Sequence, residues 1–117
     1  IEESASVVGK KEGEGPLGSR FDMVGLDDMF GEDTWEKAES SMQKEACQLA
    51  LGKAHLTAGA IRYLFGGDLL RQGVATSLGV EQLQIPMFGL YGACSTSGEA
   101  LAWHRCVWRQ DTESGCS

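Results

Sequence analysis

Residues 85–97 read Ile-Pro-Met-Phe-Gly-Leu-Tyr-Gly-Ala-Cys-Ser-Thr-Ser, and this stretch decides the fold. Its apolar first half predicts a buried strand over 85–91, and the residues from Ser95 onward are compatible with a helix. Cys94 would then lie at the turn between the two. A cysteine at a helix start lies beside unpaired backbone N–H groups and the positive end of the helix dipole, and both favour a thiolate. Cys94 is therefore the first candidate for nucleophilic or ligand-binding chemistry.

Strand and helix patterns alternate on the N-terminal side of this stretch. The best-defined helix begins at residues 33–36, Asp-Thr-Trp-Glu, which have the form of a capping box. The weakest contains Gly73 and Gly79, which lower helix propensity. The predicted elements are strands over 4–9, 61–65 and 85–91, helices over 34–52, 69–84 and from about 95 onward, and a loop over 10–19. Alternating strands and helices predict an α/β fold with a mainly parallel sheet.

Composition restricts the class of protein. The chain has 117 residues, enough for one hydrophobic core, and a formal net charge of −7. Residues 1–45 hold 12 acidic and 5 basic side chains, so we expect no nucleic acid as a direct partner. No apolar run approaches the ~20 residues that span a bilayer, and we expect no transmembrane segment. Four cysteines without a tight spacing favour a reducing, cytosolic compartment.

Five blocks of sequence carry a more specific signal. Together they closely resemble the stage V sporulation protein AD family of spore-forming Firmicutes, and the resemblance covers residues 4–102. The blocks are Lys-Glu-Gly-Glu-Gly-Pro-Leu-Gly at 11–18, Asp-Asp-Met-Phe-Gly at 27–31, Thr-Trp-Glu-Lys-Ala-Glu-Ser at 34–40, Gly-Asp-Leu-Leu at 67–70 and Gly-Leu-Tyr-Gly-Ala-Cys-Ser-Thr at 89–96. The resemblance implies a thiolase-like fold, of which residues 1–102 would be an incomplete N-terminal domain.

What the resemblance implies about function is a role in sporulation. Members of the family are associated with moving dipicolinic acid into the developing spore. The implied protein binds dipicolinic acid, works with membrane-embedded proteins of the same uptake machinery, and lies peripherally on the cytoplasmic side of the forespore or spore inner membrane. The resemblance implies no cofactor and no metal.

Enzymatic activity is the main alternative. Within the resemblance, Cys94 falls where the thiolase superfamily keeps its acylated nucleophile. Thiolase-type chemistry also needs histidine or asparagine groups, which in the superfamily come from the C-terminal half. His55 and His104 match none of those motifs, so we expect this chain to be inactive as an acyltransferase. A thiolase-type acyltransferase with Cys94 as nucleophile and an inert truncated remnant stay open as the other interpretations.

A bound dianion such as dipicolinate would need local positive potential. Backbone N–H groups at 93–96 supply some, the hydroxyls of Ser95 and Thr96 can assist, and Asp68 is a candidate for the same pocket. Arg62 and Arg71 are the nearest basic residues in the sequence. The alternatives are that Ser95, Thr96 and Asp68 only cap helices, that the arginines are solvated, and that Cys94 is an inert thiol.

Residues 103–117 depart from the family pattern. They begin Trp-His-Arg-Cys-Val-Trp-Arg-Gln, which shows neither a helical stripe nor strand alternation. We interpret them as a non-homologous tail, and our hypothesis is that a frameshift produced it. His104, Cys106 and Cys116 could instead suggest a metal site, but a fourth ligand at a usual spacing is missing.

Overall fold

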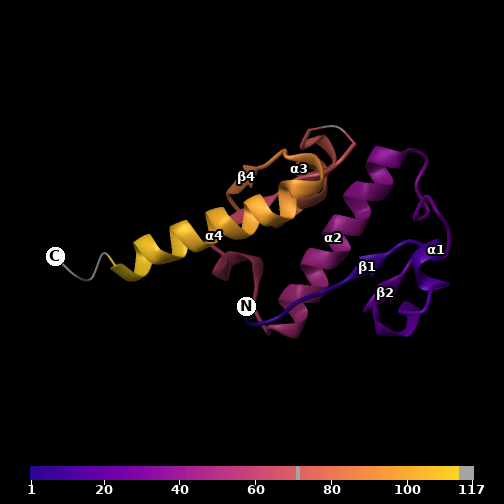
Figure 1. The fold of residues 1–117 in the computed structure, drawn as a ribbon, viewed down its shortest axis with the longest axis horizontal. Coiled ribbons are helices and arrows are strands. Elements are labelled where there is room, and N and C mark those ends of the chain that lie inside the picture. Colours follow the sequence, from indigo (N-terminus) through magenta and orange to yellow (C-terminus); the bar gives the residue numbers. More distant parts are fainter. Residues whose placement is uncertain (71, 114–117) are drawn as a thin grey trace.

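The computed structural model describes residues 1–70 and 72–113 and has an α/β architecture. Strands and helices alternate along the chain, as the sequence predicts (Figure 1). The elements are β1 (Val7–Val8), α1 (Lys10–Gly13), β2 (Met23–Val24), α2 (Trp35–Lys53), β3 (Leu64–Gly66), α3 (Val74–Val80), β4 (Met87–Gly89) and α4 (Thr96–Glu113). Single turns of 3-10 helix lie at Gly18–Arg20, Ala58–Ala60, Glu81–Leu83 and Ala93–Ser95.

The strands form two separate parallel pairs. β1 pairs with β2, with Val7 opposite Met23, and β3 pairs with β4, with Phe65 opposite Phe88. Parallel strands need a crossover between them, which α1 and the turn after it supply for the first pair and α3 for the second. The parallel pairing agrees with the sequence expectation. β2 was not predicted, because two residues are too few to show alternation.

The core lies between α2 and α3. α2 packs mainly against α3 and also contacts β1, so it lies between the two strand pairs (Figure 1). Its first turn is capped by Thr34, whose Oγ1 accepts a hydrogen bond from the Lys37 N–H at 3.3 Å. The sequence predicted a capping box that starts at Asp33, whereas the N-cap in the structure is Thr34, one residue later. Asp33 instead forms an ion pair with Lys37, at 2.8 Å.

Small side chains at this helix contact allow a close approach. The buried residues include Ala38 on α2 and Ala75 and Val80 on α3. A Cβ on Gly79 would lie only 2.6 Å from the carbonyl oxygen of Ser40, so the α3 backbone nearly touches that of α2. The glycine that weakened the helix prediction is thus the one that this packing requires.

The strands are shorter than expected, and three other segments differ more from the sequence expectations. The expected loop at 10–19 contains α1 and a 3-10 turn. The helix expected over 69–84 is shortened to α3, because Gly73 has a positive φ of 96° and begins the helix as its N-cap. Beyond residue 103, where no helix was expected, α4 continues to Glu113. The other four residues of the proposed tail, 114–117, lie outside the described residues.

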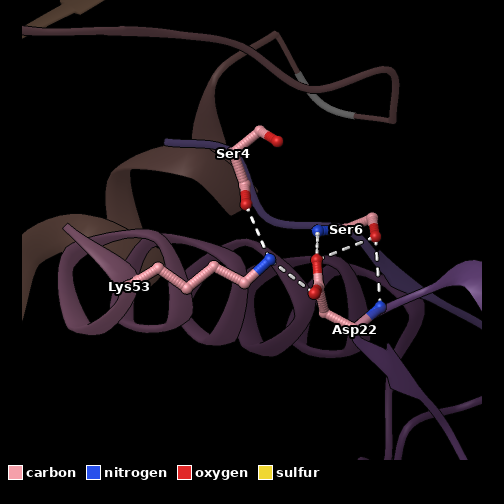
Figure 2. A network of polar contacts seen from close by, with 4 residues as sticks. All are labelled: Ser4, Ser6, Asp22 and Lys53. Atoms are coloured by element: carbon pink, nitrogen blue, oxygen red, sulfur yellow. Dashed lines mark hydrogen bonds and ion pairs between the residues drawn. The ribbon is translucent and has the colours of Figure 1, made fainter. Parts of the chain in front are cut away.

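A polar network fastens the end of α2 to the first strand pair (Figure 2). The ammonium group of Lys53 forms an ion pair with Asp22 Oδ1 and donates to the Ser4 carbonyl at 2.9 Å. The other carboxylate oxygen of Asp22 accepts from the N–H and hydroxyl of Ser6, at 2.8 and 3.0 Å. The hydrogen bond from Lys53, helped by those from Ser6, lowers the pKa of Asp22 below its usual value.

Candidate functional site

A pocket of about 400 Å³ lies at the carboxyl ends of β3 and β4. This edge of a parallel sheet is where ligands commonly bind in α/β proteins. The lining residues come from α2, from the end of β3 and the segment after it, from the 3-10 turn before α4 and from the start of α4. They are Glu39, Phe65, Gly66, Gly67, Asp68, Leu69, Ala93, Cys94, Thr96, Ser97 and Ala100. The structure therefore brings Cys94, Thr96 and Asp68 together, and it leaves Ser95 outside the pocket wall.

The turn that carries Cys94 is strained and tightly closed. Ala93 has a φ of 49°, a left-handed conformation that costs a non-glycine residue about 1–3 kcal/mol. Cys94 follows it and is exposed. The Thr96 hydroxyl accepts from the Gly92 N–H at 3.0 Å and donates to the Ala93 carbonyl at 2.8 Å. The Ser95 hydroxyl donates to the Gly92 carbonyl at 2.6 Å. Both hydroxyls thus close the turn.

Asp68 is buried and holds the start of α3. Its side chain is 4% exposed, and it lies directly after Gly67 at the end of β3. One oxygen accepts from the Gly73 N–H at 3.1 Å, and the other accepts from the N–H and hydroxyl of Thr76, both at 3.0 Å. These three donors satisfy much of the carboxylate's hydrogen-bonding capacity, so Asp68 acts as a cap as well as a lining residue of the pocket.

Glu39 is a lining residue that the sequence reasoning missed. Its Oε1 accepts a hydrogen bond from the Leu69 N–H at 3.3 Å, while Oε2 is buried and has no hydrogen-bond partner among the described residues. The available signal was its spacing, because Glu39 lies four residues after Trp35 and so places a carboxylate at the edge of the apolar stripe of α2.

Positive charge near the pocket comes from the backbone. Among the residues that the structure describes, no Lys or Arg side chain lines it. The Arg62 guanidinium lies 5.7 Å from the ring centroid of Tyr63, and Arg71 falls outside the described residues. Within the described residues, the N-terminal end of α4 is a source of positive potential close to Cys94.

The other candidate groups lie away from this pocket. His104 lines a larger, mostly apolar groove of about 520 Å³ between the end of α2 and α4. Cys47 is half-buried on α2, and burial raises the pKa of its thiol. In residues 1–70 and 72–113 no three His, Cys, Asp or Glu side chains gather in a way that could hold a metal ion, and Cys116 lies outside that range. Across the same residues, no helix is long and apolar enough to cross a bilayer.

Comparison with known proteins agrees with the five sequence blocks. The family model for stage V sporulation protein AD matches residues 1–113. The chain belongs to the stage V sporulation protein AD family. A curated relative, stage V sporulation protein AD of Bacillus subtilis (strain 168), is 40% identical over 103 residues, which are 87% of this chain and 30% of the relative. The chain thus spans about a third of the length of that relative.

The part of the chain that matches the family contains the whole Cys94 pocket. All the lining residues of the Cys94 pocket fall within the part matched by the stage V sporulation protein AD model. That part also includes the whole of α4, from Thr96 to Glu113.

Proposed function

We propose that this chain belongs to a thiolase-like sporulation protein that binds dipicolinic acid without catalysis, and that the ligand occupies the Cys94 pocket. The observation that supports this most directly is the meeting of Cys94, Thr96 and Asp68 in one pocket at the carboxyl ends of parallel strands. A carboxylate of the ligand would lie against the N-terminal end of the helix that starts here. Asp68 would contribute by holding the segment opposite.

Charge decides how such a ligand is oriented. The Asp68 carboxylate is already met by three donors from α3 and its N-terminal turn. Glu39 adds a second carboxylate to the wall, and a dianion would be repelled by it. The carboxylates of dipicolinate therefore belong at the Cys94 side of the pocket, away from Glu39.

A thiolase-type acyltransferase is the second candidate, because Cys94 is exposed at a strained turn. Acyl transfer needs a base beside the thiol. Within the described residues no histidine lines the Cys94 pocket, and His104 lies in the other groove. The described residues therefore supply the thiol of an acyltransferase and no base for it.

Calorimetric titration with dipicolinate, beside mass spectrometry after incubation with an acyl-CoA, tests the proposal. We expect saturable dipicolinate binding, no mass increase, and a loss of about tenfold in affinity for Cys94→Ala, the size of one lost contact. Cys106→Ala removes another exposed thiol and is the matched control. Glu39→Gln, which removes a negative charge from the pocket wall, is expected to tighten binding.

The full-length Bacillus subtilis relative is titrated in parallel. Acylation of Cys94 would support the acyltransferase in place of the binding protein. Absence of dipicolinate binding in both proteins would overturn the proposed function. Binding by the relative alone would identify the 117-residue chain as an inert remnant.

We further propose that the protein acts peripherally at the cytoplasmic side of the forespore or spore inner membrane, with membrane-embedded partners of the same uptake machinery. Residues 1–102 form the thiolase-like part in this proposal, and 103–117 form a tail altered by a frameshift. The family model matches residues 1–113 and so includes part of this segment. The nucleotide sequence tests the frameshift, because an alternative reading frame must encode the family's own continuation.

A further inference from the structure

The segments that follow β3 and β4 lie in close contact beside the Cys94 pocket, at Gly67 and Leu90. Beyond the paired strands, the Leu90 N–H donates to the Gly66 carbonyl at 2.8 Å, so the ends of β3 and β4 stay side by side. Gly67 follows at this contact. A Cβ built on it would overlap the Leu90 carbonyl oxygen and lie 2.8 Å from Cγ2 of Thr96. Real Cβ atoms do not approach other atoms so closely, so a side chain here must displace a neighbour.

Both neighbours that such a Cβ meets, the Leu90 carbonyl and the Thr96 methyl, belong to the stretch that carries the Cys94 turn, and Thr96 is the residue that closes this turn. Thr96 uses its hydroxyl to accept from the Gly92 N–H and to donate to the Ala93 carbonyl. Ala93 is held in a left-handed conformation, which persists only where the surroundings enforce it. Displacing Thr96 would therefore release the turn that presents Cys94.

The segment that contains Gly67 cannot easily retreat. Asp68 is buried and bonded to Gly73 and Thr76, and the Leu69 N–H is bonded to Glu39 on α2. These contacts fix the segment from the side opposite the Cys94 turn. A side chain at position 67 would thus push on the turn and leave the better-anchored segment in place.

We propose that Gly67 is a positioning residue for Cys94: its missing side chain sets the separation between the 67–70 segment and the Cys94 turn, and hence the width of the pocket. This inference concerns the pocket of the proposed function and rests on that function for its biological meaning. Its test measures the turn itself, so it can fail while dipicolinate binding holds, and the reverse is also true.

Gly67→Ala is compared with Gly98→Ala by amide hydrogen exchange measured by NMR. Gly98 lies in the first turn of α4, and a Cβ there meets nothing within 4 Å, which makes it the matched control. We expect exchange of the Gly92 N–H to accelerate about tenfold in Gly67→Ala, the size expected for one lost hydrogen bond. Amides in the middle of α2 should exchange at the unmodified rate in both variants.

Alkylation of the thiols adds a second readout. The pH profile of Cys94 alkylation should change in Gly67→Ala, with exposed Cys106 as the internal reference, and stay unchanged in Gly98→Ala. Unaltered Gly92 exchange in Gly67→Ala, or equal acceleration across α2, overturns the proposal. If Gly67→Ala does not fold, Thr96→Val is measured in its place, because it keeps the shape of the side chain that faces Gly67 and removes the hydroxyl that closes the turn. Faster Gly92 exchange in Thr96→Val, with α2 unchanged, supports the proposal, and unaltered Gly92 exchange overturns it.

Discussion

Asp22 joins the N-terminal strands to α2 through its two carboxylate oxygens. One oxygen pairs with Lys53 and the other accepts two hydrogen bonds from Ser6 (Figure 2). These partners lower the pKa of Asp22 below 3.8 in the folded chain. The stability that a group with a lowered pKa provides is fully present above its unfolded pKa and is lost as the pH falls through the folded value.

We therefore expect Asp22→Asn to flatten the acid dependence of stability. The variant should be less stable than the unmodified chain at neutral pH, and the difference should shrink as the pH falls below 3.8. Circular dichroism, followed during thermal unfolding at a series of pH values, measures this. Asp28→Asn alters an exposed aspartate and is the control. A constant difference between Asp22→Asn and the unmodified chain across this pH range would contradict the assignment.

The positions of single residues were predicted correctly where contacts between neighbours in the sequence determine them. Cys94 and Thr96 were expected at the start of a helix, and they lie there because the turn closes through backbone groups of adjacent residues. Whether Ser95 faces the pocket depends on the path of the 3-10 turn, which the sequence does not determine. Glu39 was missed because its partner, the Leu69 N–H, lies 30 residues away.

The contact between α2 and α3 depends on a position without a side chain. Gly79 is buried, and its neighbour across the contact is the backbone of Ser40, which cannot move as a flexible side chain could. Helix propensity alone would make alanine better than glycine by about 1 kcal/mol. Overpacking a well-packed contact costs about 1–3 kcal/mol, so the steric term is the larger one.

Gly79→Ala is therefore expected to lower the free energy of unfolding by about 1–2 kcal/mol. Gly52→Ala, in the last turn of α2, is the matched control because a Cβ there meets nothing within 4 Å. That control should be neutral or stabilising. Urea denaturation of both variants measures the difference, and an equal gain in stability for the two would show that the helices can separate at no cost.

The bounds of a helix were predicted more accurately where the local sequence specifies the helix strongly. The helix expected over 34–52 matches α2 to within a residue at each end, because an apolar stripe and a capping threonine both specify it locally. α3 was overestimated at its start, because Gly73 takes a positive φ and the Asp68 carboxylate bonds to Gly73 and Thr76, contacts that the local sequence does not reveal. The part of α4 beyond residue 103 was missed, although Leu101, His104 and Trp108 line one groove at helical spacing.

The molecule as a whole leaves much apolar surface in contact with water. Leu26 is 92% exposed, and Leu101 and Trp108 on α4 are each 61% exposed. The latter two also line the groove of about 520 Å³ between α2 and α4. Monomeric proteins rarely expose contiguous apolar surface of this kind, and it marks interaction sites or a tendency to associate.

We expect the 117-residue chain to associate in a concentration-dependent way and to bind a hydrophobic dye. Light scattering coupled to size-exclusion chromatography measures the association. Leu101→Glu should weaken it, since this change places a charge in the groove. A monomer at all accessible concentrations, with no dye binding, would contradict the expectation and would require the exposed side chains to be covered within one molecule.

For the molecule as a whole, the sequence predicted the fold class, and it did not predict how the strands are arranged. The alternation of strand and helix patterns indicated parallel pairing, which both strand pairs show. Their separation into two pairs depends on α2 lying between them, a long-range contact with no signature in any one segment.

The fluorescence of the three tryptophans should report the folding of the chain poorly. It should report contact with other molecules well. Trp35, Trp103 and Trp108 are 58%, 52% and 61% exposed. Indole emission shifts with the polarity of the surroundings, so the folded chain should emit at wavelengths close to those of the unfolded chain. A blue shift would instead report that another surface has covered α4 or the start of α2.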